Sequence, residues 1–241
     1  MPPPAPPALD AKILARFESL GDNCEFGFVQ RQCGMEDGGL LRWAVSPLEN
    51  LMAILESDFA GLYEFENLVP CASDMVTDNG TKLIFHSKMR SENGKFLLGA
   101  DERRKIYAEE KQKMDYLVAK LRKRLTNPAT IFVYKREAGA SDAQAAALHT
   151  ALRRTATNSL LMVAKEADRE KWGTITDLGN GLLRGHIDRF APWSQADQVS
   201  LALWRQLIKQ ADRLRPDPSR HGLKGMANLA KRAARRIFAA R

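Results

Sequence analysis

Cys24 is the residue of this chain whose type and position most suggest covalent chemistry. It follows the apolar run 17–20 and a glycine turn at Gly21, and it precedes a segment with helical character. This spacing predicts a thiol at a strand-to-helix junction, where free backbone N–H groups and the helix dipole favour an anion. Because the pKa of a cysteine falls at a helix N-terminus, we expect Cys24 to be a nucleophile. The alternative is a small buried apolar residue, as free cysteines commonly are.

A cysteine nucleophile needs a base, usually a histidine, within hydrogen-bond distance. His86 ends an apolar strand expected over residues 82–86, at a position where a side chain can face a cleft. The other histidines are assigned to a further strand, a helix and a linker: His186, His149 and His221. We therefore expect Cys24 and His86 to form a catalytic pair. The alternative for a strand histidine is a packed or hydrogen-bonded structural role.

A third residue is needed to orient the imidazole. Asp177 is assigned this role because it lies at the carboxyl end of the strand expected over 174–178, the edge where open α/β sheets bind ligands. Asp22 and Asn23 are closer to Cys24 in sequence and could instead cap the helix or donate to an oxyanion. For all three residues, ordinary turn and cap chemistry is the alternative. Substrate binding is assigned to the loop and to a later aromatic segment: Gly21, Asp22, Asn23, Arg42 and Trp43.

Other chemistries have no support in the sequence. The loop around Cys24 lacks the GxGxxG pattern and the Gly-Lys-Ser/Thr signature, so a nucleotide site is not indicated. The three cysteines form no CxxC pair and no His/Cys cluster at metal spacing. We expect no metal, no cofactor and no disulfide framework, which fits a reducing compartment.

The net charge of +8 is concentrated at one end of the chain. Residues 220–241 carry seven basic residues and no acidic one, so 37 minus 7 leaves 30 basic against 29 acidic residues in the body. This distribution argues against nucleic-acid binding by the folded body. With 44% hydrophobic and 27% charged residues, the composition is that of an ordinary globular protein.

Three regions are expected along the chain. Residues 1–10 are predicted to be a disordered proline-rich N-terminus, 11–215 an α/β domain, and 216–241 a linker with a basic amphipathic tail. The tail either contacts an anionic membrane surface through residues 220–241 or is solvated. Because no apolar run reaches the ~18 residues of a membrane helix and no signal peptide is recognisable, we expect a cytoplasmic protein. Peripheral contact with the inner face of the membrane is the further expectation for the tail.

Strands and helices are expected to alternate in the second half of the chain. Continuous apolar strands are expected at 130–134, 159–164 and 182–187, with helices at 141–155 and 197–214. Before them, Asn79-Gly80 is typical of a hairpin turn between strands at 75–77 and 82–86. A long charged helix over 100–125 follows. The pattern predicts an α/β fold with a mostly parallel three-layer sheet, a β-hairpin insertion and a basic C-terminal helix.

Several short motifs occur in an order that is similar to a known family. Ser19-Leu20-Gly21-Asp22-Asn23-Cys24, Leu40-Leu41-Arg42-Trp43-Ala44 and a later strand ending in His86 resemble a bacterial family of unknown function described as papain-like cysteine peptidases. The chain departs from the family at Leu41-Arg42-Trp43, where the family has Pro-Phe-Asp-Trp, and at Ser87, where the family has an acid. If that acid contributes to the site, this chain needs a substitute for it.

The resemblance implies a cysteine-dependent hydrolase or acyl transferase of the papain-like type. It also implies a link to surface-polysaccharide biosynthesis, with a glycan or glycoconjugate as substrate. The alternative function is a non-catalytic or sugar-nucleotide-binding domain associated with glycosyltransferase pathways, in which Cys24 is merely buried. The reactivity of the Cys24 thiol distinguishes the two hypotheses.

Overall fold

The structure is a computed structural model that describes residues 9–216. The basic C-terminal helix expected at 222–240 and most of the expected disordered N-terminus lie outside the described residues. No helix within the described range is long and apolar enough to cross a membrane. The fold is α/β, as expected, with a central sheet in which parallel pairing dominates.

The central sheet has five strands. Their order is β1 (Phe17–Ser19), β8 (Ile131–Lys135), β9 (Ser159–Lys165), β11 (Leu182–Ile187) and β10 (Ile175–Asp177). The first four strands run parallel, and β10 pairs antiparallel with β11. The middle strands are mainly apolar because both faces of the sheet are covered, and their polar exceptions include Lys135, Arg184 and His186. The continuous apolar strands predicted from the sequence are therefore confirmed.

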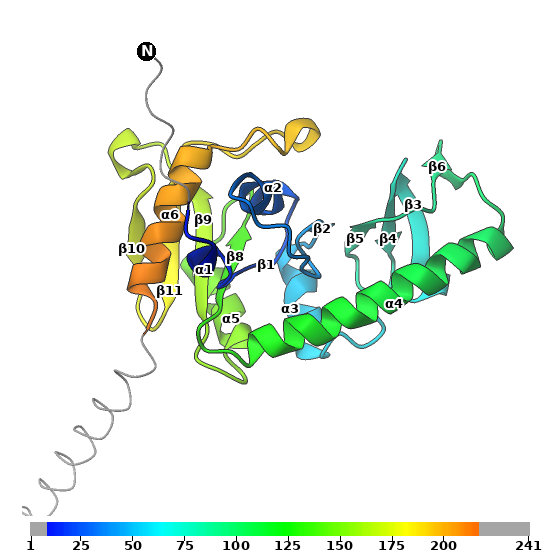
Figure 1. Ribbon diagram of the computed structural model, residues 1–241, viewed down its shortest axis with the longest axis horizontal. Helices are drawn as coiled ribbons and strands as arrows, with labels where there is room; N and C mark the ends of the chain where they lie inside the picture. Colours follow the sequence, from blue (N-terminus) through cyan, green and yellow to red (C-terminus); the bar gives the residue numbers. More distant parts are fainter. Residues whose placement is uncertain (1–8, 217–241) are drawn as a thin grey trace, which may run out of the picture.

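Helices cover both faces of this sheet (Figure 1). On one face, α1 (Ala11–Leu14), α2 (Glu25–Gln32) and α6 (Leu201–Leu214) pack on a core that includes Ile131 and Val133. On the other face, α3 (Leu48–Glu56) and α5 (Asp142–Leu152) share a core with Phe132 and Tyr134. Alternate residues of β8 thus point to opposite cores, which is the two-residue period of a strand. The three-layer arrangement follows from this alternation.

A second, antiparallel sheet lies beside the first (Figure 1). Its strand order is β2 (Ala44–Val45), β5 (Ile84–His86), β4 (Met75–Asp78) and β3 (Leu68–Ala72). The β4–β5 hairpin confirms the prediction from Asn79-Gly80, but the positive φ of 62° falls on Lys82. Asp78 holds the turn instead, because its carboxylate accepts from the backbone N–H of Gly80 at 2.9 Å and from the hydroxyl of Thr81 at 2.8 Å.

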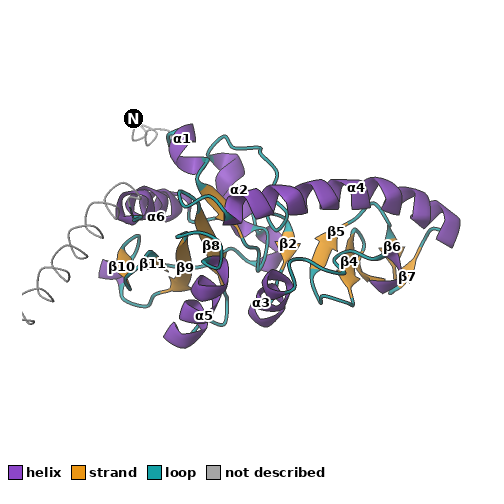
Figure 2. Cartoon of the chain, turned by 90° about the horizontal axis from the view of Figure 1, so that it is seen from below, coloured by secondary structure: helices purple, strands orange, loops and turns teal. Residues whose placement is uncertain are grey.

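The 26-residue helix α4 (Ala100–Leu125) runs along both sheets (Figure 2). Its C-terminal half contributes Leu117, Val118 and Leu121 to the core under the central sheet. Its N-terminal half follows a small hairpin of β6 (Ser91–Glu92) and β7 (Lys95–Phe96). Single-turn 3-10 helices complete the described part: η1 (Phe65–Asn67), η2 (Arg169–Lys171) and η3 (Trp193–Gln195).

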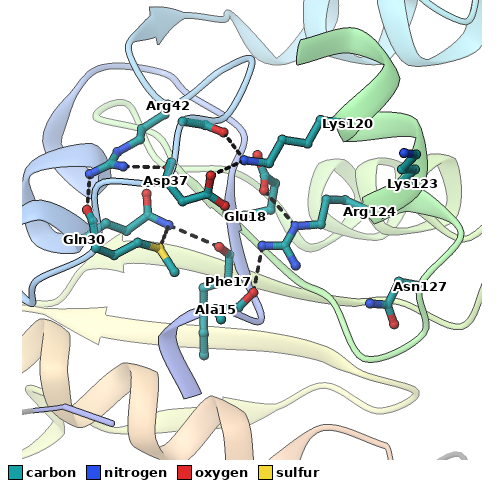
Figure 3. A network of polar contacts seen from close by, with 12 residues as sticks. Ala15, Phe17, Glu18, Gln30, Asp37, Arg42, Lys120, Lys123, Arg124 and Asn127 are labelled. Carbon is teal, nitrogen blue, oxygen red and sulfur yellow. Dashed lines mark hydrogen bonds and ion pairs between the residues drawn. The ribbon is translucent and has the colours of Figure 1, made fainter. Parts of the chain in front are cut away.

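A buried polar network fastens α4 to β1, the strand that leads to Cys24 (Figure 3). The Glu18 carboxylate is 5% exposed and lies 3.1 Å from the guanidinium of Arg124. Burial raises the pKa of Glu18, and the positive charge of Arg124 opposes that rise. Lys120, one turn earlier on α4, pairs with Asp37 in the loop after α2. The network therefore ties the long helix to both ends of the segment that contains Cys24.

Candidate functional site

The loop before Cys24 has a conformation that requires glycine. Gly21 has a φ of +87°, and a Cβ atom there would lie 2.3 Å from the hydroxyl oxygen of Ser46. That hydroxyl donates to the carbonyl of Leu20 and accepts from the backbone N–H of Asp22 at 3.0 Å. The turn between β1 and α2 is thus fixed to Ser46, which lies two residues before the start of α3. Gly21 and Asp22, expected to bind substrate, shape the turn in this way.

Cys24 is the residue immediately before α2, as the sequence predicted. The side-chain oxygen of Asn23 accepts from the backbone N–H of Glu25 at 2.9 Å and so caps the first turn of the helix. Asn23 and Cys24 both line one cavity of about 250 Å³. The thiol and the amide are therefore presented to the same space at the start of a helix.

The predicted pair is in contact. The sulfur of Cys24 lies 3.8 Å from Nε2 of His86, within the range of a hydrogen bond that involves sulfur. His86 is the last residue of β5, and the neighbouring strand β2 ends its pairing at Phe85. His86 is still paired with Met75 of β4 but has no partner on the β2 side, and its imidazole contacts the thiol at the start of α2. Two elements separated by 62 residues supply the pair.

An acid that the sequence did not indicate completes the arrangement. Oδ2 of Asp74 lies 3.4 Å from Nδ1 of His86, and the two side chains are 45% and 47% exposed. Asp74 belongs to the turn between β3 and β4, and its backbone carbonyl accepts from the N–H of Ser87. With Nδ1–H directed at Asp74, the lone pair of Nε2 faces the thiol of Cys24. This is the order of nucleophile, base and orienting acid found in catalytic triads.

The electrostatic setting of Cys24 corrects one expectation. Burial is the main cause that raises the pKa of the Cys24 thiol above its ordinary value, and the negative charge of Asp74 raises it further. The positive charge of Lys135 acts in the opposite direction. The expected lowering at a helix N-terminus is therefore outweighed by desolvation. A thiol that stays protonated near neutral pH depends on a base in contact with it, which is the position of His86.

The cavity in front of Cys24 is largely aromatic. Phe28, Trp43, Met75 and Trp193 line it together with the residues already described and with three residues that follow Trp193, namely Ser194, Ala196 and Asp197. Phe28 and Trp43 contact edge to face with ring centroids 5.0 Å apart. Trp193, at the start of η3, is 62% exposed and stands at the cavity. Trp43 thus lines the cavity, in agreement with its expected position near the substrate.

A buried ion pair lies directly behind the nucleophile. The Glu25 carboxylate is fully buried and lies 3.1 Å from Nζ of Lys135, which is 2% exposed. The same carboxylate accepts from the indole N–H of Trp204 at 3.0 Å and from the backbone N–H of Ala191 at 3.2 Å. Glu25, the residue after Cys24, thereby joins four segments: α2, β8, α6 and the chain that leads to η3.

Asp177 is not brought to the pair. Because β10 runs antiparallel to β11, Asp177 pairs with Leu183 near the amino end of the parallel strands. Cys24 follows the carboxyl end of β1, which is at the opposite edge of the sheet, with β8, β9 and β11 in between. The Asp177 carboxylate accepts from the N–H of Gly179 at 2.8 Å and so stabilises a turn. The structure gives the position next to the imidazole to Asp74.

Arg42 also has a place different from the one expected. It is 1% exposed, and its guanidinium donates to the backbone carbonyls of Gly27, Met35 and Asp37 at 2.7–3.1 Å. Its guanidinium carbon lies 4.9 Å from the centre of the Trp43 ring. Arg42 therefore supports Trp43 from behind and holds the loop after α2, without lining the cavity.

The two other histidines within the described residues, His186 and His149, have structural roles. His186 lies in β11, with Nδ1 3.2 Å from Glu166 and Nε2 2.9 Å from the hydroxyl of Thr176. His149 contacts the backbone carbonyl of Asn158 at 3.2 Å, and burial lowers its pKa. Both ring nitrogens of His186 and Nε2 of His149 are thus engaged in structural contacts. His221 lies outside the described residues.

Replacing Asp74 by asparagine is expected to separate the reactivity of Cys24 from its catalysis. Removing the carboxylate removes a charge that raises the thiol pKa, so the pH profile of Cys24 alkylation by iodoacetamide moves to lower pH. Acylation of Cys24 is expected to slow, because the imidazole loses the group that orients it, but by less than the about 10,000-fold of a buried triad aspartate, since the Asp74 side chain is 45% exposed. Alkylation and acylation rates measured across pH check both signs. Asp177→Asn is the matched control, and equal effects of the two substitutions would remove the assigned role of Asp74.

Within residues 9–216 no group of three histidine, cysteine, aspartate or glutamate side chains is placed to hold a metal ion. Comparison of the chain with models of protein families, with curated proteins and with solved structures gave no match in any of the three cases.

Proposed function

We propose that this protein is a cysteine-dependent hydrolase or acyl transferase. Cys24 attacks an acyl carbon, His86 accepts the thiol proton, and Asp74 holds the imidazole in the required tautomer. The observation that carries this proposal is the alignment of three side chains from three different segments, with distances of 3.8 Å and 3.4 Å. The resemblance to papain-like peptidases rests on the same cysteine and histidine and supports the proposal independently of the geometry.

The steps of the proposed reaction follow from this alignment. As the sulfur–carbon bond forms, the thiol proton passes to Nε2 of His86, and the carbonyl oxygen becomes an oxyanion. The backbone N–H of Cys24 and the amide NH₂ of Asn23 donate to no other group within the described residues, and the two residues line the cavity of the thiol. They are the proposed oxyanion donors. His86 then gives the proton to the leaving group, and water or another acceptor attacks the thioester.

The aromatic cavity fits a substrate whose acyl half carries a sugar ring or a flat apolar group. Trp43 and Trp193 present ring surface at the cavity that holds the thiol. Such faces stack on sugar rings as well as on apolar chains. We therefore propose a glycan or glycoconjugate as the substrate, which is the class that the sequence resemblance implies. A binding domain without catalysis would use the same cavity but would leave Cys24 unreacted.

The test is a pre-steady-state reaction with p-nitrophenyl acetate. We expect a burst of p-nitrophenolate that approaches one equivalent per chain, followed by slower turnover as the thioester is hydrolysed. Cys24→Ser is expected to abolish the burst, whereas Cys33→Ser, which alters a half-buried thiol outside the cavity, retains it. A burst of equal size in Cys24→Ser, or no burst in the unaltered protein, would contradict the proposal.

A further inference from the structure

His86 stands between two cavities of different character. The aromatic cavity of about 250 Å³ contains Cys24 and His86, whereas a second cavity of about 530 Å³ contains His86 and Asp74 but not Cys24. The second cavity is formed by the segment after β5 and by the middle of α4, and its wall is mostly charged: Lys88, Arg90, Glu109, Glu110 and Lys113. We call it the charged cavity. A substrate that reaches the sulfur and the imidazole together can therefore extend in two directions.

The chemistry of acyl transfer assigns one half of the substrate to each cavity. The acyl carbon becomes bonded to the sulfur of Cys24, so the acyl half occupies the aromatic cavity. The leaving nitrogen or oxygen receives its proton from Nε2 of His86, and the rest of the departing half can extend from there past the imidazole into the charged cavity, which His86 also lines. We infer that the charged cavity binds the leaving group, and an acceptor in the reverse direction, and that Lys113 recognises an anionic group on it. This inference rests on the proposed function.

The charges of this cavity single out Lys113. Glu110 is held by the hydroxyls of Tyr63 and Ser87, each at 2.9 Å, and by the backbone N–H of Lys88 at 2.7 Å. The ammonium of Lys88 lies 3.3 Å from Glu109.

Arg90 lies 4.0 Å from Asp74, the carboxylate that also faces His86. Among the described residues, Lys113 makes no ion pair, although it lines the same wall. Lys113 is thus the cation of this wall that is not engaged in an ion pair among the described residues, and it is available for an anion of the ligand. A carboxylate is the simplest such group, and a peptide or uronic acid terminus carries one.

Acceptor partitioning tests this assignment, because an acceptor amine uses the leaving-group site in reverse. The amine nitrogen attacks the thioester carbon, the carbon–sulfur bond breaks, and the amine proton passes through His86 to the sulfur. The protein is acylated with p-nitrophenyl acetate in the presence of glycylglycine or glycylglycinamide, and the N-acetyl product is compared with free acetate. These acceptors have the same amine but differ in the negative charge of the carboxylate.

The unaltered protein is expected to favour glycylglycine over glycylglycinamide. Lys113→Gln is expected to reduce that preference by about 2- to 5-fold, the range for a solvent-exposed ion pair. Lys105→Gln removes the same charge from α4 at a residue that does not line the cavity, and it should leave the preference intact. If the unaltered protein used glycylglycine and glycylglycinamide equally, or if the two substitutions had equal effects, the inference would be overturned. The burst, and with it the proposed function, would not be affected by either result. Absence of the burst would overturn the proposed function and this inference together.

Discussion

Replacing His86 by alanine is expected to slow acylation of Cys24 by about 100- to 10,000-fold, the usual contribution of a general base. The reason is that burial and the Asp74 carboxylate keep the Cys24 thiol protonated near neutral pH. Without the imidazole at 3.8 Å, nothing in contact with the sulfur accepts its proton. The rate is measured as the first-order burst with p-nitrophenyl acetate.

Imidazole added to the solution separates a catalytic role of His86 from a structural one. The cavity left by the alanine variant opens to solvent, because the His86 side chain is 47% exposed. Free imidazole is therefore expected to restore part of the acylation rate in proportion to its concentration. His186→Ala, which removes a histidine held by Glu166 and Thr176, is the matched control and is expected to keep the burst. A His86→Ala variant that acylates at the original rate would refute the assignment.

Glu25→Gln is expected to destabilise the fold by about 3–5 kcal/mol, the usual cost of leaving one partner of a buried ion pair without its counter-charge. Glutamine keeps the size of the side chain, but its single oxygen can accept from only one of the two donors, Trp204 and Ala191, which bond different oxygens of Glu25. It leaves the ammonium of Lys135, which is 2% exposed, without a negative partner. Urea unfolding monitored by tryptophan fluorescence measures the loss, and Trp204 in the core contributes to that signal together with the other three tryptophans.

Two controls define what the Glu25 result means. Glu36→Gln breaks an ion pair of similar length, 3.3 Å to Arg31, but both partners are exposed, so a change within about 1 kcal/mol is expected. Glu25→Gln combined with Lys135→Met removes both charges and is expected to recover much of the stability lost by the single variant. A single variant no less stable than Glu36→Gln would show that the buried pair is not needed to hold the loop of Cys24.

The local patterns of this sequence predict those parts of the fold that depend on near neighbours. The apolar strands β8, β9 and β11 were predictable because strands buried on both faces have few polar positions to interrupt the pattern. The β4–β5 hairpin was predictable from its turn. Cys24 and His86 were predictable as a pair because each lies at the end of its element, where side chains are free to meet.

The parts that depend on register and strand direction were not predictable in this way. Asp74 faces His86 only because β3, β4 and β5 pair in one register, and β3 contains a proline and a bulge that obscure its strand pattern. Asp177 was assigned to the site on the assumption that its strand runs parallel to its neighbours, and β10 runs the other way. A sequence window shows the type of a residue but not which turn lies opposite it.

Burial was the other quantity that the sequence could not supply. The pKa of a cysteine at a helix N-terminus depends on how far the helix end is desolvated, and packing around Cys24 reverses the expected direction. Burial also explains why the expectation for Arg42 was wrong. Its charge and its position next to Trp43 suggested a residue that binds substrate. The structure instead buries its guanidinium against three backbone carbonyls. Lys135, which directly follows the apolar residues 131–134 at the end of β8, was the available signal for a buried ion pair.

The position of the acyl group within the chain tests the central claim most directly. A sample quenched during the burst with p-nitrophenyl acetate is digested, and the acetyl occupancy of Cys24, Cys33 and Cys71 is measured by peptide mass spectrometry. Cys71 is the exposed thiol, so accessibility favours it, whereas Cys24 is half-buried and burial raises the pKa of its thiol. We predict that Cys24 is acetylated first, and that His86→Ala removes this selectivity. Acetylation of Cys71 ahead of Cys24 in the unaltered protein would contradict a catalytic role for Cys24.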